Sequence, residues 1–194
     1  LIMNEDIDEE MRREFPAEIQ KSTLLLTGLV NSMLEVANLD VSEDKLPCGP
    51  TDIRNICIQE MEKISPKPRI KYQLDITEDT LFIPTNAQYL TMVIEHLLNN
   101  ANKFTEEGFI ALGYKVNLSK NQICISVTDS GCGIPKEKQE EVFNRFSKLD
   151  TFVPGNGLGL YLCRLIVKRL DGEIKIDPEY TDGTRVVVNL PMNE

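Results

Sequence analysis

The sequence is short of histidine and of paired cysteine, and both shortages limit the chemistry that it can support. His96 is the one histidine in 194 residues. The five cysteines, at positions 48, 57, 124, 132 and 163, form no Cys-x-x-Cys pair. Because structural zinc sites need clusters of cysteine and histidine, we expect no zinc site. The cysteines at 57, 124 and 163 stand among apolar residues, which predicts buried thiols in a reducing cytosol.

Long apolar runs and an excess of positive charge are also missing. No apolar stretch approaches the ~18 residues that a membrane-spanning helix requires, and no signal peptide opens the chain. Acidic residues number 31 and basic residues 21, so the net charge is −10. This balance argues against binding to nucleic acid or to an anionic membrane. With 41% hydrophobic and 27% charged residues, the chain has the composition of a globular protein with a core.

Two glycine clusters are present between residues 128 and 160. The first, Asp129-Ser130-Gly131-Cys132-Gly133, follows the alternating run 122–128, so it lies just past the end of a strand. The second, Gly155-Asn156-Gly157-Leu158-Gly159, leads into the segment 158–170, whose apolar residues recur at helical spacing. Exposed N–H groups at a helix N-terminus suit an anion such as phosphate. The two clusters therefore suggest the two ends of a nucleotide.

The glycines have a simpler explanation, because glycine pairs usually mark turns. Neither cluster has the Gly-x-Gly-x-x-Gly spacing of a dinucleotide site, and neither is followed by the Gly-Lys-Ser/Thr of a P-loop. A third segment favours the nucleotide interpretation. His96 and Asn100 lie four residues apart, on one face of an otherwise apolar helical pattern.

In this order, these segments resemble the catalytic ATP-binding domain of sensor histidine kinases. The resemblance covers roughly residues 8 to 192. Each box is weak evidence alone, but four in order are strong evidence. The Asn box is Asn100-Ala101-Asn102-Lys103-Phe104-Thr105, the first glycine box Asp129-x-Gly131-x-Gly133, the phenylalanine box Val142-Phe143-Asn144-Arg145-Phe146, the second glycine box Gly155-x-Gly157-Leu158-Gly159-Leu160, and the closing pair Gly183-Thr184.

The resemblance implies a role for each box in binding ATP and Mg²⁺. Asp129 is expected to accept a hydrogen bond from the adenine amine, while Gly131 and Gly133 let the backbone approach the ring. Asn100 is the implied magnesium ligand, because magnesium prefers hard oxygen atoms. The alternative for Asp129 is a residue that caps a turn.

Further residues are implied to contact the phosphates. Lys103, one helical turn after Asn100, and Lys148, two residues after Phe146, match basic positions of the family. For both lysines the alternative is a solvated surface charge. The second glycine box is implied to bind phosphate through Gly155, Gly157, Leu158 and Gly159.

The sequence departs from the family pattern at two positions. His96 occupies the place of the first asparagine of the usual Asn-x-x-x-Asn, as a similar histidine does in chemotaxis-type kinases. With Asn100, it is a candidate catalytic residue. It could orient a magnesium-bound water or the attacking group, or it could be a hydrogen-bonded interface residue. The lid, residues 147–154, is short, so it could close less completely over the triphosphate.

The phosphoacceptor box of these kinases, a histidine followed by an acidic residue, is absent from the sequence. Because His96 lies inside the nucleotide domain, it is not expected to replace the acceptor, and the chain should not phosphorylate itself. The resemblance implies transfer of the ATP γ-phosphate to a histidine missing from this sequence, and then to an aspartate of a response regulator.

The N-terminal segment predicts one long helix from Asp8 to about Leu39. Its apolar residues follow the three-four alternation of a coiled coil, so we expect a partner helix. The alternative is an ordinary amphipathic helix packed on its own domain, and the hinge described below argues against it. Pro16 interrupts the helix as a first-turn residue or, preferably, as a kink. Residues 40–50 predict a hinge. The apolar seam consists of Met11, Phe15, Ile19, Leu26, Leu29, Met33 and Val36.

These features divide the chain in two. By resemblance, residues 1–46 are the second helix of the dimerisation and phosphotransfer hairpin, and residues 47–194 are the catalytic domain. The full-length protein is then expected to be a homodimer through this helix, and the start Leu1-Ile2-Met3 is typical of the tail of an earlier helix. We therefore expect an excised cytoplasmic part of a membrane-anchored parent, with no direct membrane contact of its own.

The remaining pattern predicts an α/β sandwich, a mixed and mostly antiparallel sheet with helices on one face. Asp52 and Asn86 are expected to cap helices. The predicted helices end near residues 64, 105, 146 and 170, the third being a short one from 138; the predicted strands are 70–76, 81–84, 109–118, 122–128, 173–176 and 185–190.

Two other classes of function remain compatible with the sequence. One is another ATPase or serine kinase of the same superfamily, such as an anti-sigma kinase or a gyrase-type ATPase. Those enzymes usually place a glutamate where this chain has His96, although Glu95 is adjacent. The other is a nucleotide-binding interaction module in which the boxes maintain only the fold.

Overall fold

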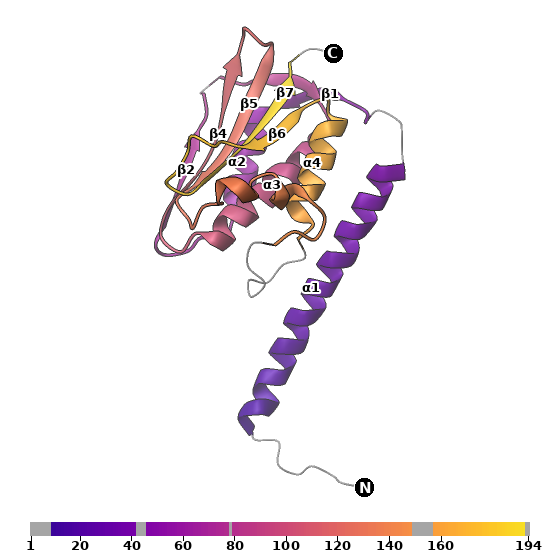
Figure 1. The fold of residues 1–194 in the computed structure, drawn as a ribbon, viewed down its shortest axis with the longest axis vertical. Coiled ribbons are helices and arrows are strands. Elements are labelled where there is room, and N and C mark those ends of the chain that lie inside the picture. Colours follow the sequence, from indigo (N-terminus) through magenta and orange to yellow (C-terminus); the bar gives the residue numbers. More distant parts are fainter. Residues whose placement is uncertain (1–8, 42–45, 78, 149–156, 193–194) are drawn as a thin grey trace.

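The computed structural model of the chain describes residues 9–41, 46–77, 79–148 and 157–192. A five-stranded sheet with helices packed on one face forms the body, and one long helix extends away from it (Figure 1). The predicted sandwich is therefore confirmed. Its elements are α1 (Glu9–Val41), β1 (Gly49–Asp52), α2 (Ile53–Lys63), β2 (Ile70–Asp75), β3 (Phe82–Thr85), α3 (Ala87–Phe104), β4 (Gly108–Asn117), β5 (Gln122–Asp129), α4 (Gly159–Arg169), β6 (Glu173–Ile176) and β7 (Thr184–Pro191).

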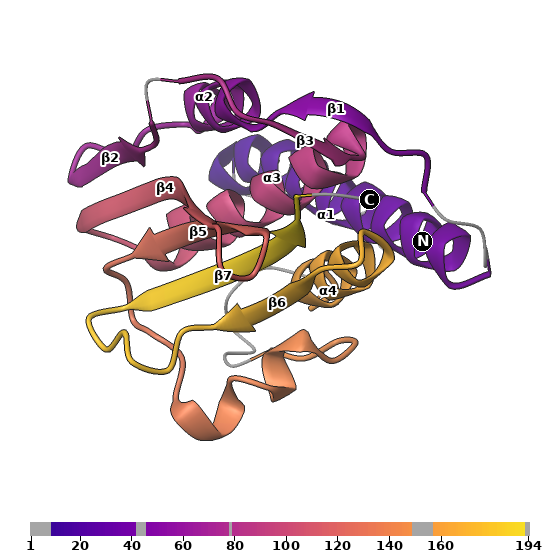
Figure 2. The ribbon, with the colours of Figure 1, turned by 90° about the horizontal axis from the view of Figure 1, so that it is seen from above.

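The strand order of the main sheet is β2-β4-β5-β7-β6. Strands β2 and β4 run parallel, and the other three pairs are antiparallel. The view in Figure 2 shows α2, α3 and α4 on the same side of this sheet. Alternate residues of each central strand point toward the helices, as the period of two requires. The buried residues of this face include Ile110, Leu112, Ile123, Ile125, Val127, Val186 and Val188.

Helices α2 and α3 begin at the predicted caps. The Asp52 carboxylate accepts a hydrogen bond from the Asn55 N–H at 3.0 Å, and the Asn86 side chain accepts one from the Tyr89 N–H at 3.1 Å. Each bond satisfies one of the N–H groups that a helix leaves free at its start. The cap at Asn86 sets the phase of α3 and thereby the direction in which its polar residues point.

Two sequence-based expectations were wrong. The last two residues of the predicted hinge at 40–50 belong to strand β1 (Gly49–Asp52), which pairs antiparallel with β3. Its partner lies far along the chain, so the local proline and glycine content indicated only a loop. Residues 138–146 do not form one helix. The structure has two single 3-10 turns, Lys136–Lys138 and Glu141–Phe143, because only Val142 and Phe143 of this polar segment are buried.

The cysteine expectation is confirmed for two of three thiols. Cys57 and Cys163 are buried, whereas Cys124 is half-buried on the sheet. Burial raises the pKa of the Cys57 thiol to about 12 and raises the pKa of Cys163 further. Such thiols stay protonated and unreactive at neutral pH.

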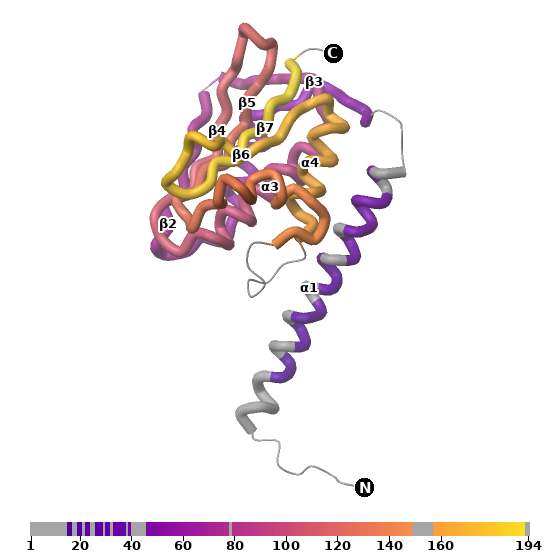
Figure 3. Tube along the Cα trace, in the orientation of Figure 1, coloured from indigo at the N-terminus to yellow at the C-terminus, as the bar shows by residue number. Residues whose placement is uncertain are grey.

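Within the described residues, helix α1 packs on α4 near its own C-terminal end (Figures 1 and 3). There Val36 and Leu39 are buried in the common core, and the Arg169 guanidinium of α4 donates a hydrogen bond to the Leu39 carbonyl. Pro16 lies inside the helix and not in its first turn. None of the helices in the described ranges has both the length and the hydropathy needed to cross a bilayer.

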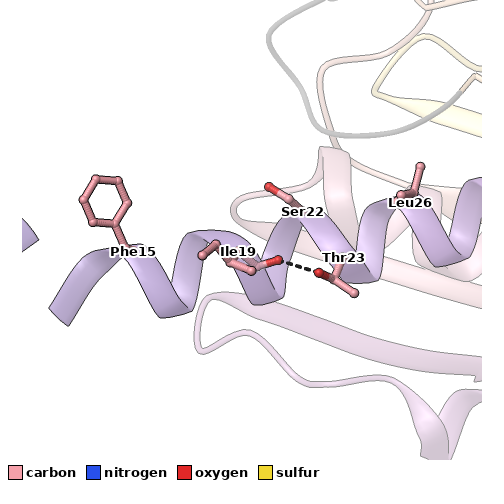
Figure 4. A pocket seen from close by; sticks show the side chains of 5 residues that line it. All are labelled: Phe15, Ile19, Ser22, Thr23 and Leu26. Atoms are coloured by element: carbon pink, nitrogen blue, oxygen red, sulfur yellow. Dashed lines mark hydrogen bonds between the residues drawn. The ribbon is translucent and has the colours of Figure 1, made fainter. Parts of the chain in front are cut away.

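The rest of the described seam on α1 is exposed. Figure 4 shows Phe15, Ile19 and Leu26 along the helix, with the Thr23 hydroxyl turned back to the Ile19 carbonyl at 2.8 Å. Met33 is also exposed, while the side chains of Met11 and Leu29 lie outside the described residues. The long helix is confirmed, and its partner helix stays a prediction.

The packing of α1 on α4 predicts a contrast between two leucines of the same helix. Leu39 is 2% exposed, so Leu39→Ala should lower the free energy of unfolding by about 2–4 kcal/mol through lost burial and a residual cavity. Leu34 is 57% exposed, so Leu34→Ala should change it by less than about 0.5 kcal/mol. Urea denaturation of both variants measures the difference. Equal effects would show that α1 does not share the core.

Candidate functional site

The polar residues of α3 identified from the sequence lie along one side of the helix. His96, Asn100 and Lys103 are spaced by four and three residues, which brings their side chains onto adjacent turns. His96 and Asn100 are half-buried, and Lys103 is exposed. Among the described residues, no group forms a hydrogen bond with the Asn100 amide. An amide oxygen on a mostly apolar helix is thus available to a ligand.

His96 connects α3 to the second glycine cluster. A Cβ atom placed on Gly159, the first residue of α4, would lie 3.7 Å from the His96 Nδ1 atom. Burial lowers the pKa of His96, and the neighbouring Glu95 carboxylate opposes this effect without overcoming it. The imidazole is therefore neutral at pH 7 and carries one donor and one acceptor nitrogen. Either role suggested by the sequence is open to it.

Two ammonium groups approach each other beside the end of α3. The pKa of Lys103 is lowered, first by partial burial and second by the positive charge of Lys148. Neither lysine has a carboxylate partner within the part of the chain that the structure describes. Two neighbouring cations without counter-charges favour an anion between them. The segments that bear them are 45 residues apart in sequence (148 minus 103).

The Asp129 carboxylate is held rigidly at the end of β5. The residue is 6% exposed, and its Oδ1 atom accepts hydrogen bonds from the N–H groups of Gly131 at 2.9 Å and Thr184 at 3.2 Å. Burial raises the pKa of Asp129, while these two bonds act in the opposite direction. No group within the described ranges donates to Oδ2. Asp129 does cap a turn, as the alternative proposed, and still presents a second oxygen to a ligand.

Gly131 allows the backbone of the first glycine cluster to touch the end of α3. A Cβ atom at Gly131 would lie 2.4 Å from the Phe104 carbonyl oxygen, closer than any real Cβ contact. This contact brings the Asn box next to Asp129. At Gly133 the backbone has φ = 72°, in the left-handed region that glycine adopts without strain.

The second glycine cluster is described from Gly157 onward, and Gly155 lies outside the described residues. Gly157 has φ = 68°, and its ideal Cβ position is 2.7 Å from the Phe146 carbonyl carbon and 2.8 Å from the Ser147 carbonyl oxygen. The described residues on either side of segment 149–156 therefore lie close together here. Leu158 is buried and provides no side-chain cap to α4. The helix dipole of α4 then favours an anion at this end.

Arginine side chains hold the 3-10 turns of the phenylalanine box on α4. Arg164 donates to the Asn144 side chain at 3.2 Å and lies over the Phe143 ring at 5.6 Å. Arg145 lies over the ring of Tyr161 at 4.8 Å. This support was not predicted from the sequence, because residues 20 apart on an irregular segment and a helix carry no shared periodicity.

The residues that hold the last turn of α3 were also not predicted from the sequence. Asn102 belongs to the Asn box, but its side chain points away from the site and bonds Tyr72 and Ser65. Lys67 donates to carbonyl oxygens of the same turn. The sequence indicated only the element in which each residue lies: Lys67 in the turn after a helix and Tyr72 in a strand.

Comparison with known proteins agrees with this arrangement. The profile of the "Histidine kinase-, DNA gyrase B-, and HSP90-like ATPase" family matches residues 85–194, more than half of the chain. The chain belongs to this ATPase family. Within it, the similarities are to the catalytic ATP-binding domains of sensor histidine kinases.

Three curated relatives illustrate this similarity. The sensor-like histidine kinase ycf26 of Pyropia yezoensis is 29% identical, over 93% of the chain and 30% of that protein. The adaptive-response sensory kinase SasA of Synechocystis sp. is 28% identical over 99% and 52%. The sensor histidine kinase WalK of Bacillus subtilis is 26% identical over 96% and 32%. The chain thus spans about a third to a half of the relatives that it matches.

Solved structures show the same fold. Full-length ShkA, crystallised in complex with AMPPNP, superposes with a TM-score of 0.79 and 25% identity, over 92% of this chain and 38% of that one. The histidine kinase AdeS of Acinetobacter baumannii superposes with a TM-score of 0.70, over 96% of this chain and 86% of AdeS. Its sequence identity is 17%, so this similarity shows the fold alone.

The geometry of the second glycine cluster predicts opposite outcomes for two of its glycines. Gly157→Ala should lower the free energy of unfolding by about 1–3 kcal/mol, because Ala would strain a positive φ and clash with backbone atoms. Gly159→Ala should be neutral or slightly stabilising, because its Cβ would meet only His96 at 3.7 Å and Ala favours helix. Thermal and urea unfolding measure both. A Gly157→Ala variant as stable as Gly159→Ala would contradict the described backbone.

Proposed function

We propose that the chain is the ATP-binding catalytic part of a two-component sensor histidine kinase. One observation carries the proposal. Among the described residues, the buried Asp129 carboxylate keeps one oxygen without a hydrogen bond, and the Lys103 and Lys148 ammonium groups, which have no carboxylate partner there, interact beside the end of α3. Asp129 and the lysine pair suit the adenine and the phosphates of one ATP molecule. The AMPPNP complex of ShkA and the family match support this reading.

At the adenine end, Asp129 would accept a hydrogen bond from the exocyclic amine through Oδ2. The two N–H groups on Oδ1 fix the direction of the carboxylate before the ligand arrives. Because the residue is only 6% exposed, the carboxylate is largely desolvated, and a bound ligand that cannot donate leaves Oδ2 unpaired. The site should therefore select adenine over bases that present an acceptor at that position.

At the phosphate end, Lys103 and Lys148 would neutralise the charge of the triphosphate. The second glycine cluster, with Gly155, Gly157, Leu158 and Gly159, would contribute N–H groups and the positive end of the α4 dipole. Phosphoryl transfer depends on such positioning and charge stabilisation more than on covalent chemistry by the protein.

Asn100 fits a magnesium ion that arrives with the nucleotide. Its amide oxygen is a hard ligand, and no described residue occupies it. The described residues contain no group of three carboxylate, histidine or cysteine side chains that would hold a metal without phosphate oxygens. When bound, the ion would neutralise charge that develops on the transferred phosphoryl group. The chain's own task is to place the Asn100 oxygen beside His96, whose neutral imidazole can hydrogen-bond a water or the attacking group.

The phosphoryl acceptor would be a histidine outside residues 1–194, followed by an aspartate of a response regulator. The relatives are sensor kinases of greater length, and the single histidine of this sequence lies on α3 inside the ATPase domain. Residues 1–46 would be the second helix of a dimerisation and phosphotransfer hairpin, and residues 47–194 the catalytic domain. The exposed apolar residues of α1 support pairing with another helix in a homodimer. The catalytic part would work in the cytoplasm of a membrane-anchored parent, without nucleic acid.

A hydrolytic ATPase is less well supported. Such enzymes usually place a glutamate where this chain has His96, and the adjacent Glu95 is exposed on another side of α3. An interaction module is also disfavoured, because within the described residues the side chains of Asn100, Lys103 and Lys148 form no hydrogen bond or ion pair that would stabilise the fold.

The adenine assignment predicts the effect of one isosteric change. Asp129→Asn should weaken the affinity for ATP and ADP by about 10- to 100-fold, because the amide loses the charge and one acceptor. The affinity for inorganic tripolyphosphate should change by less than about twofold. Asp182→Asn removes the same charge from an exposed position and should leave ATP within about twofold. Isothermal titration calorimetry with magnesium measures these affinities. Unchanged ATP binding by Asp129→Asn would remove Asp129 from the site.

The kinase assignment predicts that the 194-residue chain transfers phosphate only to an added acceptor. Incubated with labelled ATP and magnesium, it should gain no acid-labile, base-stable phosphate. An added helical hairpin that carries the acceptor histidine should be labelled in trans. Asn100→Asp should abolish that labelling without unfolding the chain, whereas Asn99→Asp, the same change on an exposed neighbour, should preserve it. Stable labelling of His96 would overturn the assignment.

A further inference from the structure

Three side chains outside the candidate site hold the last turn of α3. The Lys67 ammonium, from the turn between α2 and β2, donates hydrogen bonds to the carbonyl oxygens of Asn102 and Thr105, the latter at 2.9 Å. Carbonyl groups at a helix C-terminus lack partners within the helix, and a cation there also interacts favourably with the helix dipole. Lys67 therefore caps α3 from another element.

The Tyr72 hydroxyl joins this cap to the Asn102 side chain. It donates to the Asn102 Oδ1 atom at 2.8 Å and accepts from the Lys67 N–H at 3.0 Å. The Asn102 Nδ2 atom in turn donates to the Ser65 carbonyl at 3.2 Å. Lys67, Tyr72 and Asn102, here named the α3 clamp, thus fix the turn from both its main chain and its side chain.

The clamped turn carries residues that face the nucleotide site. Lys103 directly follows Asn102, and its ammonium lies 4.6 Å from the centre of the Phe104 ring, near Lys148. The Phe104 carbonyl supports Gly131 of the first glycine cluster. A lysine side chain is long and flexible, so the place and direction of its Cα–Cβ bond decide which positions its charge can reach. In the described structure, that bond is fixed by the clamp.

We propose that Lys67, Tyr72 and Asn102 are positioning residues for Lys103, and thereby set how strongly the chain prefers ATP to adenosine. The inference rests on the proposed function, because it assigns the charge of Lys103 to phosphate. The three residues themselves touch no ligand atom. They act through one turn of main chain, so their effect must disappear when the Lys103 charge is removed.

A double-mutant cycle tests this dependence. Tyr72→Phe removes one hydroxyl and leaves the ring. It should weaken the affinity for ATP by roughly threefold to tenfold, the coupling expected between neighbouring residues, and change the affinity for adenosine by less than about twofold. In the Lys103→Met background, Tyr72→Phe should weaken ATP by less than about 1.5-fold further. Lys67→Met should reproduce the pattern of Tyr72→Phe. The affinities are measured by calorimetry with magnesium, and circular dichroism establishes that each variant is folded.

Tyr89→Phe is the matched control, because Tyr89 lies in the first turn of the same helix and its hydroxyl has no hydrogen bond within the described residues. Tyr89→Phe should change the affinities for ATP and adenosine by less than about twofold. Three results would each overturn the clamp. Tyr72→Phe could weaken the affinity for ATP and for adenosine equally, weaken the affinity for ATP equally with and without Lys103, or leave the affinity for ATP unchanged. If the wild-type chain failed to bind ATP, the proposed function would fail first. Normal wild-type binding with an additive cycle would refute the clamp alone.

Discussion

The candidate site depends on one close contact between two backbones. The Phe104 carbonyl at the end of α3 lies where a side chain on residue 131 would have to be, so only glycine lets β5 and α3 end at the same point. The same device recurs at Gly183, whose Cβ position is 2.1 Å from the Asp129 carbonyl oxygen. As a result, β7 also begins here and provides the Thr184 N–H to the Asp129 carboxylate. Three elements thus converge on one aspartate.

The candidate site contains a pair of positive charges, whereas the chain as a whole is negatively charged. The net charge is −10, yet Lys103 and Lys148 lie together without carboxylate partners in the described structure. The charge of the whole chain acts weakly on a nucleotide, because salt screens interactions beyond about 8–10 Å. The local lysine pair acts at contact distance and is screened much less. Placement of a few cations therefore matters more to an anionic ligand than the overall balance.

Helix α4 connects the site with the long helix. Its first residue, Gly159, lies against His96, and Arg169 in its last turn donates to the carbonyl of Leu39 on α1. Between these ends, Arg164 holds the 3-10 turns that lead to the lid. A helix transmits displacement along its axis as a rigid body, so the orientation of α1 and the geometry of the glycine cluster share one support. The large apolar side chains of α1 that the structure describes before Val36 are exposed and take no part in this support.

The sequence by itself determined the elements and the chemistry that depends on local order. Alternation in residues 122–128, helical spacing after Leu158 and the caps at Asp52 and Asn86 each act within a few residues, so their patterns predict β5, α4, α2 and α3. The resemblance to sensor kinases rested on such local boxes as well, and it was the basis on which Asp129, Asn100 and Lys103 were predicted as site residues.

Tertiary structure decided everything that depends on partners distant in sequence. Strand β1 exists because β3 pairs with it, and the end of α1 is buried because α4 covers Val36 and Leu39. Asn102 shows the limit most clearly. It lies in the Asn box between the predicted site residues Asn100 and Lys103, but its side chain bonds Tyr72 and Ser65, 30 and 37 residues away. The spacing of residues in a sequence predicts which side of a helix a residue occupies. Which groups that residue contacts is determined by the fold of the whole chain.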